Sequence, residues 1–211
     1  MTAKNRKEVR EIVLLDEIEK CEKDIMEALT QIPAGGRVRM LINSGGGSVY
    51  AGLGIATAIE MKKIHATGVV LADCSSSALL VFASCAERYV APHASFLFHP
   101  MQWSSEERSR LPGALGWARE FRRIETACSR WICSRLNLSE ALYKSWVRRE
   151  VYVTAAELIE LGVARYIPEL EMEARVEPAR AARRAKTPAI SPAHRRARVI
   201  PAAARRRPAS K

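Results

Sequence analysis

Short apolar segments typical of β-strands alternate with longer helical segments through the first half of the chain. The strand-like segments are residues 11–15, 37–42 and 67–71, and the helical segments between and after them are residues 16–31, 49–61 and 76–86. In the first helical segment, Ile18, Cys21, Ile25 and Leu29 recur at helical spacing. Strands that alternate with helices predict βαβ units and a mostly parallel sheet, so we expect an α/β fold.

The second half of the chain is predicted to be mainly helical. Short strands are expected at residues 88–91 and 95–98, and helices at 113–136 and 139–148. Thr154 and Glu157 have the spacing of a capping box, which opens a short helix that Gly162 closes. Residues 163–167 are predicted to form the last strand.

Three turns that follow predicted strands carry groups suited to acyl transfer. The first contains Gly45-Gly46-Gly47, the second contains Ser75-Ser76-Ser77, and the third, after the strand predicted at residues 95–98, contains His99. Acyl transfer needs an anion cradle, a nucleophile and a base, and parallel sheets bind ligands at the carboxyl ends of their strands. Each feature also has a structural reading: a plain turn, a helix-capping serine and a packed histidine. Together they favour a serine hydrolase.

These segments, in this order, resemble the proteolytic subunit of the Clp protease (ClpP) family over residues 12–167. The resemblance is carried by residues 42–52 around the glycine turn, by the serine turn, by His99, and by residues 154–162. It implies a ClpP/crotonase-type spiral of ββα units with a protruding helical handle at about residues 113–148. It also implies that subunits assemble into rings around an enclosed chamber.

The resemblance assigns roles to five residues. Ser76 falls at the nucleophile position and His99 at the position of the base that later protonates the leaving amine. The backbone amides of Gly47 and Ser77 would bind the oxyanion. Glu150 falls where the family has the aspartate that orients the histidine, although it also fits a solvated charge at a helix end.

The positive charge is concentrated at the C-terminus. Residues 175–211 contain twelve Lys or Arg and one acid, Glu177, and so account for the whole net charge of +11. This segment is rich in Ala, Arg and Pro and has no aromatic residue, so we expect it to be disordered. The predicted division is a peptidase domain at residues 1–174 and a basic tail that contacts nucleic acid or acidic partners, or none.

Cysteine usage and hydropathy predict a cytoplasmic protein. The five cysteines are odd in number and form no CxxC pair, so neither a zinc site nor a disulfide framework is expected. No apolar run is long enough for a signal peptide or a membrane span. We expect no cofactor, no metal and no membrane partner.

The predicted function is that of a serine endopeptidase that acts on peptides or unfolded proteins inside a homo-oligomeric ring. A catalytically inactive ring subunit is the alternative, because Ala72 and Glu150 depart from the family pattern. The N-terminal segment lacks a counterpart of the axial loops that meet an ATPase unfoldase, so that partnership stays open. Crotonase-type acyl-CoA enzymes share the core, but the pair Ser76 and His99 favours hydrolysis.

Overall fold

In the computed structural model of the protein, the described residues are 9–103 and 110–170, within a unit that runs from Met1 to Arg175. The strands are β1 (Arg10–Glu17), β2 (Arg37–Gly46), β3 (His65–Cys74), β4 (Glu87–Val90), β5 (Ser95–Phe98), β6 (Val151–Thr154) and β7 (Arg165–Tyr166). The helices are α1 (Ile18–Thr30), α2 (Val49–Met61), α3 (Ala78–Ser84), α4 (Leu111–Leu136), α5 (Glu140–Arg149), α6 (Ala155–Glu160) and the 3-10 turn η1 (Pro168–Leu170).

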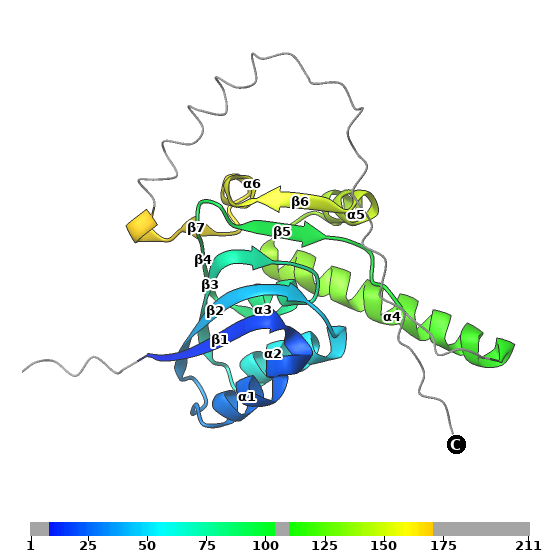
Figure 1. Ribbon diagram of the computed structural model, residues 1–211, viewed down its shortest axis with the longest axis horizontal. Helices are drawn as coiled ribbons and strands as arrows, with labels where there is room; N and C mark the ends of the chain where they lie inside the picture. Colours follow the sequence, from blue (N-terminus) through cyan, green and yellow to red (C-terminus); the bar gives the residue numbers. More distant parts are fainter. Residues whose placement is uncertain (1–8, 104–109, 171–211) are drawn as a thin grey trace, which may run out of the picture. The chain divides into compact units, whose positions relative to one another are not determined.

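The sheet is mostly parallel, as the alternation of strands and helices predicts. Its main path is β1-β2-β3-β4-β7, with all neighbours parallel. Strand β3 pairs with β4 along residues 67–70. Nearer its carboxyl end, β3 pairs instead with β5, where Asp73 lies opposite Ser95. Strand β5 then pairs with β6 in the antiparallel direction. The end of β3 therefore lies beside the start of β5, which brings the serine turn close to the strand that precedes His99 (Figure 1).

One face of the main sheet packs against helices and forms the core. Along β2, the side chains of Val38, Met40 and Ile42 are buried while their neighbours Arg37 and Arg39 are exposed, as the period of a strand requires. Helices α1, α2 and α3 cover the buried face (Figure 1). Burial of each such large apolar side chain contributes about 1.5–3 kcal/mol relative to leaving it in water.

Glycine allows α2 and α3 to approach closely. A Cβ built on Gly52 of α2 would lie 2.8 Å from the carbonyl oxygen of Ser77 and 3.2 Å from a methyl carbon of Leu80. Those distances are too short for a side chain, so the backbone of α2 rests directly against the start of α3. Helix α2 thereby supports Ser77, the last residue of the serine turn.

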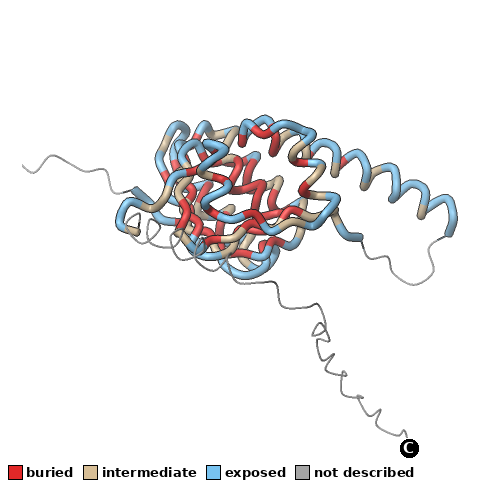
Figure 2. Tube along the Cα trace, turned by 90° about the horizontal axis from the view of Figure 1, so that it is seen from above, coloured by how far each residue is buried: buried red, intermediate tan, exposed pale blue. Residues whose placement is uncertain are grey.

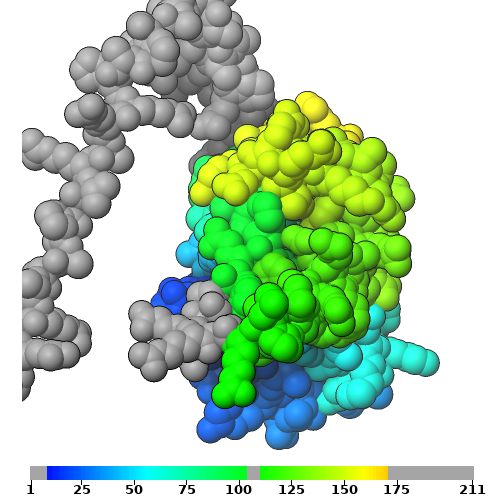
Figure 3. Space-filling view, turned by 90° about the vertical axis from the view of Figure 1, so that its right-hand side faces the viewer, coloured from blue at the N-terminus to red at the C-terminus, as the bar shows by residue number. Residues whose placement is uncertain are grey.

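Helices α4 and α5 form the predicted helical handle. The C-terminal half of α4 is buried through Ile124, Cys128 and Ile132, whereas its first turns are exposed, with Leu111 at 72% and Trp117 at 55% (Figure 2). Figure 3 looks at the side toward which α4 points, and shows its first turns in bright green in front of the core. Trp146 of α5 packs on Phe98 of β5, with ring centroids 5.0 Å apart.

The predicted elements are confirmed with shifted ends, and one strand was missed. Helix α3 begins at Ala78 rather than at residue 76, because Ser76 has a left-handed backbone with φ of 54°. The last strand contracts to Arg165–Tyr166, and the capping box of Thr154 and Glu157 is present. Strand β6 was not predicted, since it follows α5 without a Gly or Pro boundary. The predicted disordered tail, 175–211, lies outside the described residues.

Candidate active site

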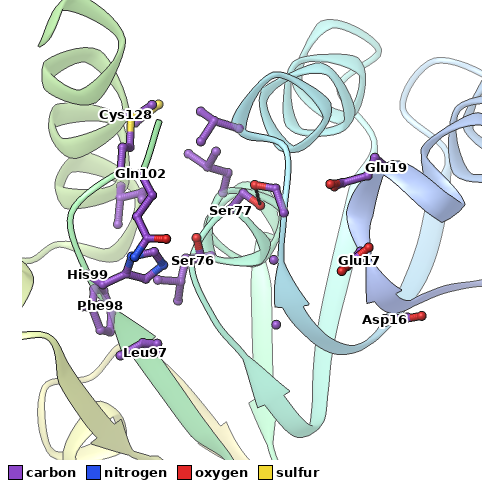
Figure 4. A pocket seen from close by; sticks show the side chains of 18 of the residues that line it. Asp16, Glu17, Glu19, Ser76, Ser77, Leu97, Phe98, His99, Gln102 and Cys128 are labelled. Atoms are coloured by element: carbon purple, nitrogen blue, oxygen red, sulfur yellow. Dashed lines mark hydrogen bonds between the residues drawn. The ribbon is translucent and has the colours of Figure 1, made fainter. Parts of the chain in front are cut away.

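A cavity of about 470 Å³ opens where β2, β3 and β5 end. Gly47, Ser76, Ser77 and His99 all line it. In Figure 4 the Ser76 hydroxyl and the His99 ring face this space from neighbouring segments, and Glu19 lies on the opposite side. Glu150 does not line the cavity. The structure therefore brings four of the five predicted residues to one cavity from three separate turns.

Ser76 stands at a strained turn between β3 and α3. Its φ of 54° lies in the left-handed region, which costs a residue with a side chain about 1–2 kcal/mol. Its amide donates to the carbonyl oxygen of Leu97 at 3.1 Å, while its hydroxyl has no hydrogen-bond partner among the described residues. Strain of this kind persists only where the surroundings hold it, and it is frequent at functional sites. The turn leaves a free hydroxyl facing the cavity.

The glycine turn packs directly against the serine turn. Gly46 has φ of 97°, and a Cβ there would lie 2.7 Å from both the Ser75 carbonyl oxygen and the Ser76 Cβ. The Gly46 amide donates to the Ser44 hydroxyl at 3.1 Å. A side chain at position 46 would therefore displace the serine turn, and only glycine fits both the conformation and the space.

Gly47 is fixed on both sides by hydrogen bonds to other elements. Its carbonyl oxygen accepts from the Ser77 hydroxyl at 3.1 Å, and the next amide, that of Ser48, donates to the Glu19 carboxylate at 2.7 Å. The backbone has φ of 127°, and a Cβ at this position would collide with the Glu19 carboxylate. Glu19 of α1 therefore holds the glycine turn, a role that no local sequence pattern indicated.

Two backbone amides beside Ser76 remain unused. Neither the Gly47 amide nor the Ser77 amide donates a hydrogen bond to any residue that the structure describes. Ser77 directly precedes α3, where helix N-termini have unpaired amides and a field that favours negative charge. A pair of free amides next to a free hydroxyl suits stabilisation of an oxyanion.

His99 and Glu150 come from adjoining strand ends. His99 is partly buried and follows β5, whereas Glu150 is exposed at the end of α5, with φ of 51°, and directly precedes β6. Among the described residues, no hydrogen bond joins His99 to either Ser76 or Glu150. Catalytic hydrogen bonds are often long in unliganded enzymes. Ser76 and Glu150 therefore both stay candidate hydrogen-bond partners of His99.

The cavity has further walls that sequence patterns did not assign to it. Helices α4 and α5 contribute Cys128, Ile132 and Tyr143, and α1 contributes Glu19. Burial raises the pKa of Cys128 to about 11 and that of Tyr143 to about 12. Both groups are therefore neutral at pH 7, and Cys128 is not an activated thiol. Helical periodicity indicated that α4 has a buried face, but not what that face would contact.

Residues 9–103 and 110–170 contain no set of three or more His, Cys, Asp or Glu side chains placed to hold a metal ion. No helix there has both the length and the apolar character that a membrane span requires.

Comparison with known proteins agrees with the fold. A search of curated proteins finds no match to the chain. The family model described as Clp protease matches residues 3–170, which include every strand and helix described above. The chain therefore belongs to the Clp protease family.

Proposed function

We propose that the protein is a serine peptidase in which Ser76 is the nucleophile and His99 the general base. Membership of the Clp protease family supports a peptidase. The observation that carries the serine mechanism is the shared cavity, which is lined by the free Ser76 hydroxyl, by His99 and by Gly47 and Ser77.

The geometry supports the usual steps of acyl transfer. His99 takes the proton of Ser76 as its oxygen attacks the peptide carbonyl, and the oxyanion accepts hydrogen bonds from the amides of Gly47 and Ser77. His99 then protonates the leaving amine, and water, deprotonated by the same imidazole, hydrolyses the acyl-enzyme. In another serine protease, one hydrogen-bond donor to the oxyanion stabilises the transition state by about 2.7–4 kcal/mol.

Glu150 is the proposed acid that orients His99 and stabilises its charged form. The support is its place directly before β6, which pairs with the strand that ends before His99. Its exposure, and its absence from the cavity wall, favour the second candidate function, an inactive ring subunit. The experiment below separates the two.

Peptides or unfolded proteins are the proposed substrates, and a homo-oligomeric ring is the proposed assembly. The first turns of α4 expose Leu111, Leu115 and Trp117, and large exposed apolar groups gathered in one place are typical of interfaces. We also propose a cytoplasmic location, because all five cysteines are free and disulfides are rare in that compartment.

A fluorophosphonate probe tests the proposal, because it reacts with activated serine hydroxyls. We expect the wild-type protein to be labelled, with the adduct on the peptide that contains Ser76, and Ser76→Ala to remain unlabelled. Ser134→Ala, at an exposed position of α4, is the matched control and keeps wild-type labelling. An unlabelled wild-type protein, or equal labelling of Ser76→Ala, rejects the serine mechanism and favours the inactive subunit.

A further inference from the structure

The hydroxyl of Ser75 connects two strands directly before the nucleophile. It donates to the Asp73 carboxylate at 2.5 Å and accepts from the Leu97 amide at 3.2 Å. Ser75 is buried, with 4% of its surface exposed. A buried hydroxyl that uses both its donor and an acceptor position has a fixed orientation. Ser75 therefore joins the end of β3 to β5 through its side chain.

Leu97 receives a second hydrogen bond from the same turn. The Ser76 amide donates to the Leu97 carbonyl oxygen at 3.1 Å. The amide and the carbonyl of Leu97 are thus both bound to the serine turn, and His99 follows two residues later. These two bonds set the position of the nucleophile relative to the segment that carries the base.

Asp73 is itself held from β2. Its amide donates to the Asn43 side-chain oxygen at 3.1 Å, and its second carboxylate oxygen lies 3.8 Å from the place of a Cβ on Gly45. Asp73 does not line the cavity, and one of its oxygens is bound by Ser75. It therefore acts through Ser75 rather than on a substrate.

We propose that Asp73 and Ser75 are positioning residues that keep Ser76 and His99 in register for acyl transfer. The inference rests on the proposed serine mechanism. The Asp73 carboxylate orients the Ser75 hydroxyl, and that hydroxyl holds the Leu97 amide. Without the hydroxyl, Leu97 loses one of its two bonds to the serine turn, and the left-handed conformation of Ser76 loses part of its support.

The test compares Ser75→Ala, Asp73→Ala and Asp73→Asn with the wild-type protein. Because a hydrogen bond to a charged group is involved, we expect Ser75→Ala and Asp73→Ala to lower kcat and the fluorophosphonate labelling rate by about tenfold to a hundredfold. KM for a small peptide changes by less than about twofold, since the cavity wall is unaltered. Asp73→Asn keeps an oxygen acceptor and so retains activity within about threefold of wild type.

Ser84→Ala is the matched control. The Ser84 hydroxyl donates only to the Val81 carbonyl oxygen within α3, at 2.7 Å, and its loss leaves both rates unchanged. Wild-type rates in Ser75→Ala and Asp73→Ala would overturn the positioning role and leave the serine mechanism intact. An unlabelled wild-type protein overturns the mechanism itself. If Ser75→Ala does not fold, Asp73→Ala and Asp73→Asn test the inference. Equal values of kcat and of the labelling rate in these two variants would overturn it.

Discussion

His99 and Glu150 are the residues next to the last backbone pair of the β5–β6 ladder, in which Phe98 pairs with Val151. The antiparallel register therefore sets the two backbones opposite each other at the ends of the strands. Glu150 is exposed, and its left-handed conformation closes α5. An acid so placed would interact with His99 through water-accessible space, where salt screens charges.

The first prediction follows from this exposure. Glu150→Gln lowers kcat by about tenfold, far less than the roughly 10⁴-fold loss on neutralising a buried triad acid. The difference from wild type shrinks as salt is raised, because screening weakens the wild-type interaction. Peptide hydrolysis at low and high salt measures both effects. Glu160→Gln, an exposed acid of α6, is the control, and a fully active Glu150→Gln removes Glu150 from the mechanism.

Adjacent glycines should respond differently to one added methyl group. Gly46→Ala places a Cβ 2.7 Å from the Ser75 carbonyl oxygen at φ of 97°, so we expect a loss of about 2 kcal/mol or more in unfolding free energy and no probe labelling. At Gly45 the nearest atom would be 3.8 Å away, so Gly45→Ala stays close to wild type. Thermal melting and labelling check the pair. Normal labelling of Gly46→Ala would contradict the packing of the two turns.

Stability and activity should separate at position 76. Ser76→Gly and Ser76→Ala both abolish labelling, but the glycine variant is more stable by about 1 kcal/mol, because φ of 54° strains alanine. In a chain of this size that corresponds to about 2–4 °C in Tm. At Ser134, inside α4, the order reverses, since alanine favours helices. The same order at both sites would refute the strain.

Alkaline pH should destabilise the protein through Tyr143. Burial raises the pKa of Tyr143 from 10 to about 12, so between pH 10 and 12 the unfolded chain loses a proton that the folded chain keeps. The unfolding free energy therefore falls as pH rises through this window, by about 2–3 kcal/mol from this group. Cys85, raised to about 12 by burial, adds a similar effect from pH 9.

Urea unfolding under reducing conditions measures this dependence. Tyr143→Phe should flatten the fall above pH 10, whereas Tyr152→Phe, at a residue 64% exposed, should not. An unchanged slope in Tyr143→Phe would mean that the phenol ionises equally easily in both states.

The sequence predicts the fold well where periodicity is local. Strands β2 and β3 and helix α2 follow from apolar runs bounded by glycine or charge. Strand β6 does not, because its four residues take their strand conformation from pairing with β5. Ser76, the first residue of a predicted helix, has a left-handed backbone instead. Local periodicity could not predict this, because the Ser76 amide donates to the Leu97 carbonyl oxygen of β5.

The candidate site also contains some residues that sequence patterns predict and others that they do not. Gly47, Ser76 and His99 are identifiable because each follows a strand, and the ends of neighbouring parallel strands meet. Glu19 is not identifiable, because its contact with Ser48 joins residues 29 positions apart and needs no particular local pattern. Asp73 and Ser75 lie within the predicted motif, yet their hydrogen bonds become evident only once β5 is placed beside β3.

Because α2 packs closely against Ser77, a substitution in α2 should affect the site from outside the cavity. A methyl group on Gly52 would press on the carbonyl of the residue whose amide is proposed to bind the oxyanion. Overpacking costs about 1–3 kcal/mol, a large part of the stability of a typical domain. Gly52→Ala is thus the substitution from which a temperature-sensitive allele is expected, active in cool-grown cells and inactive in warm ones.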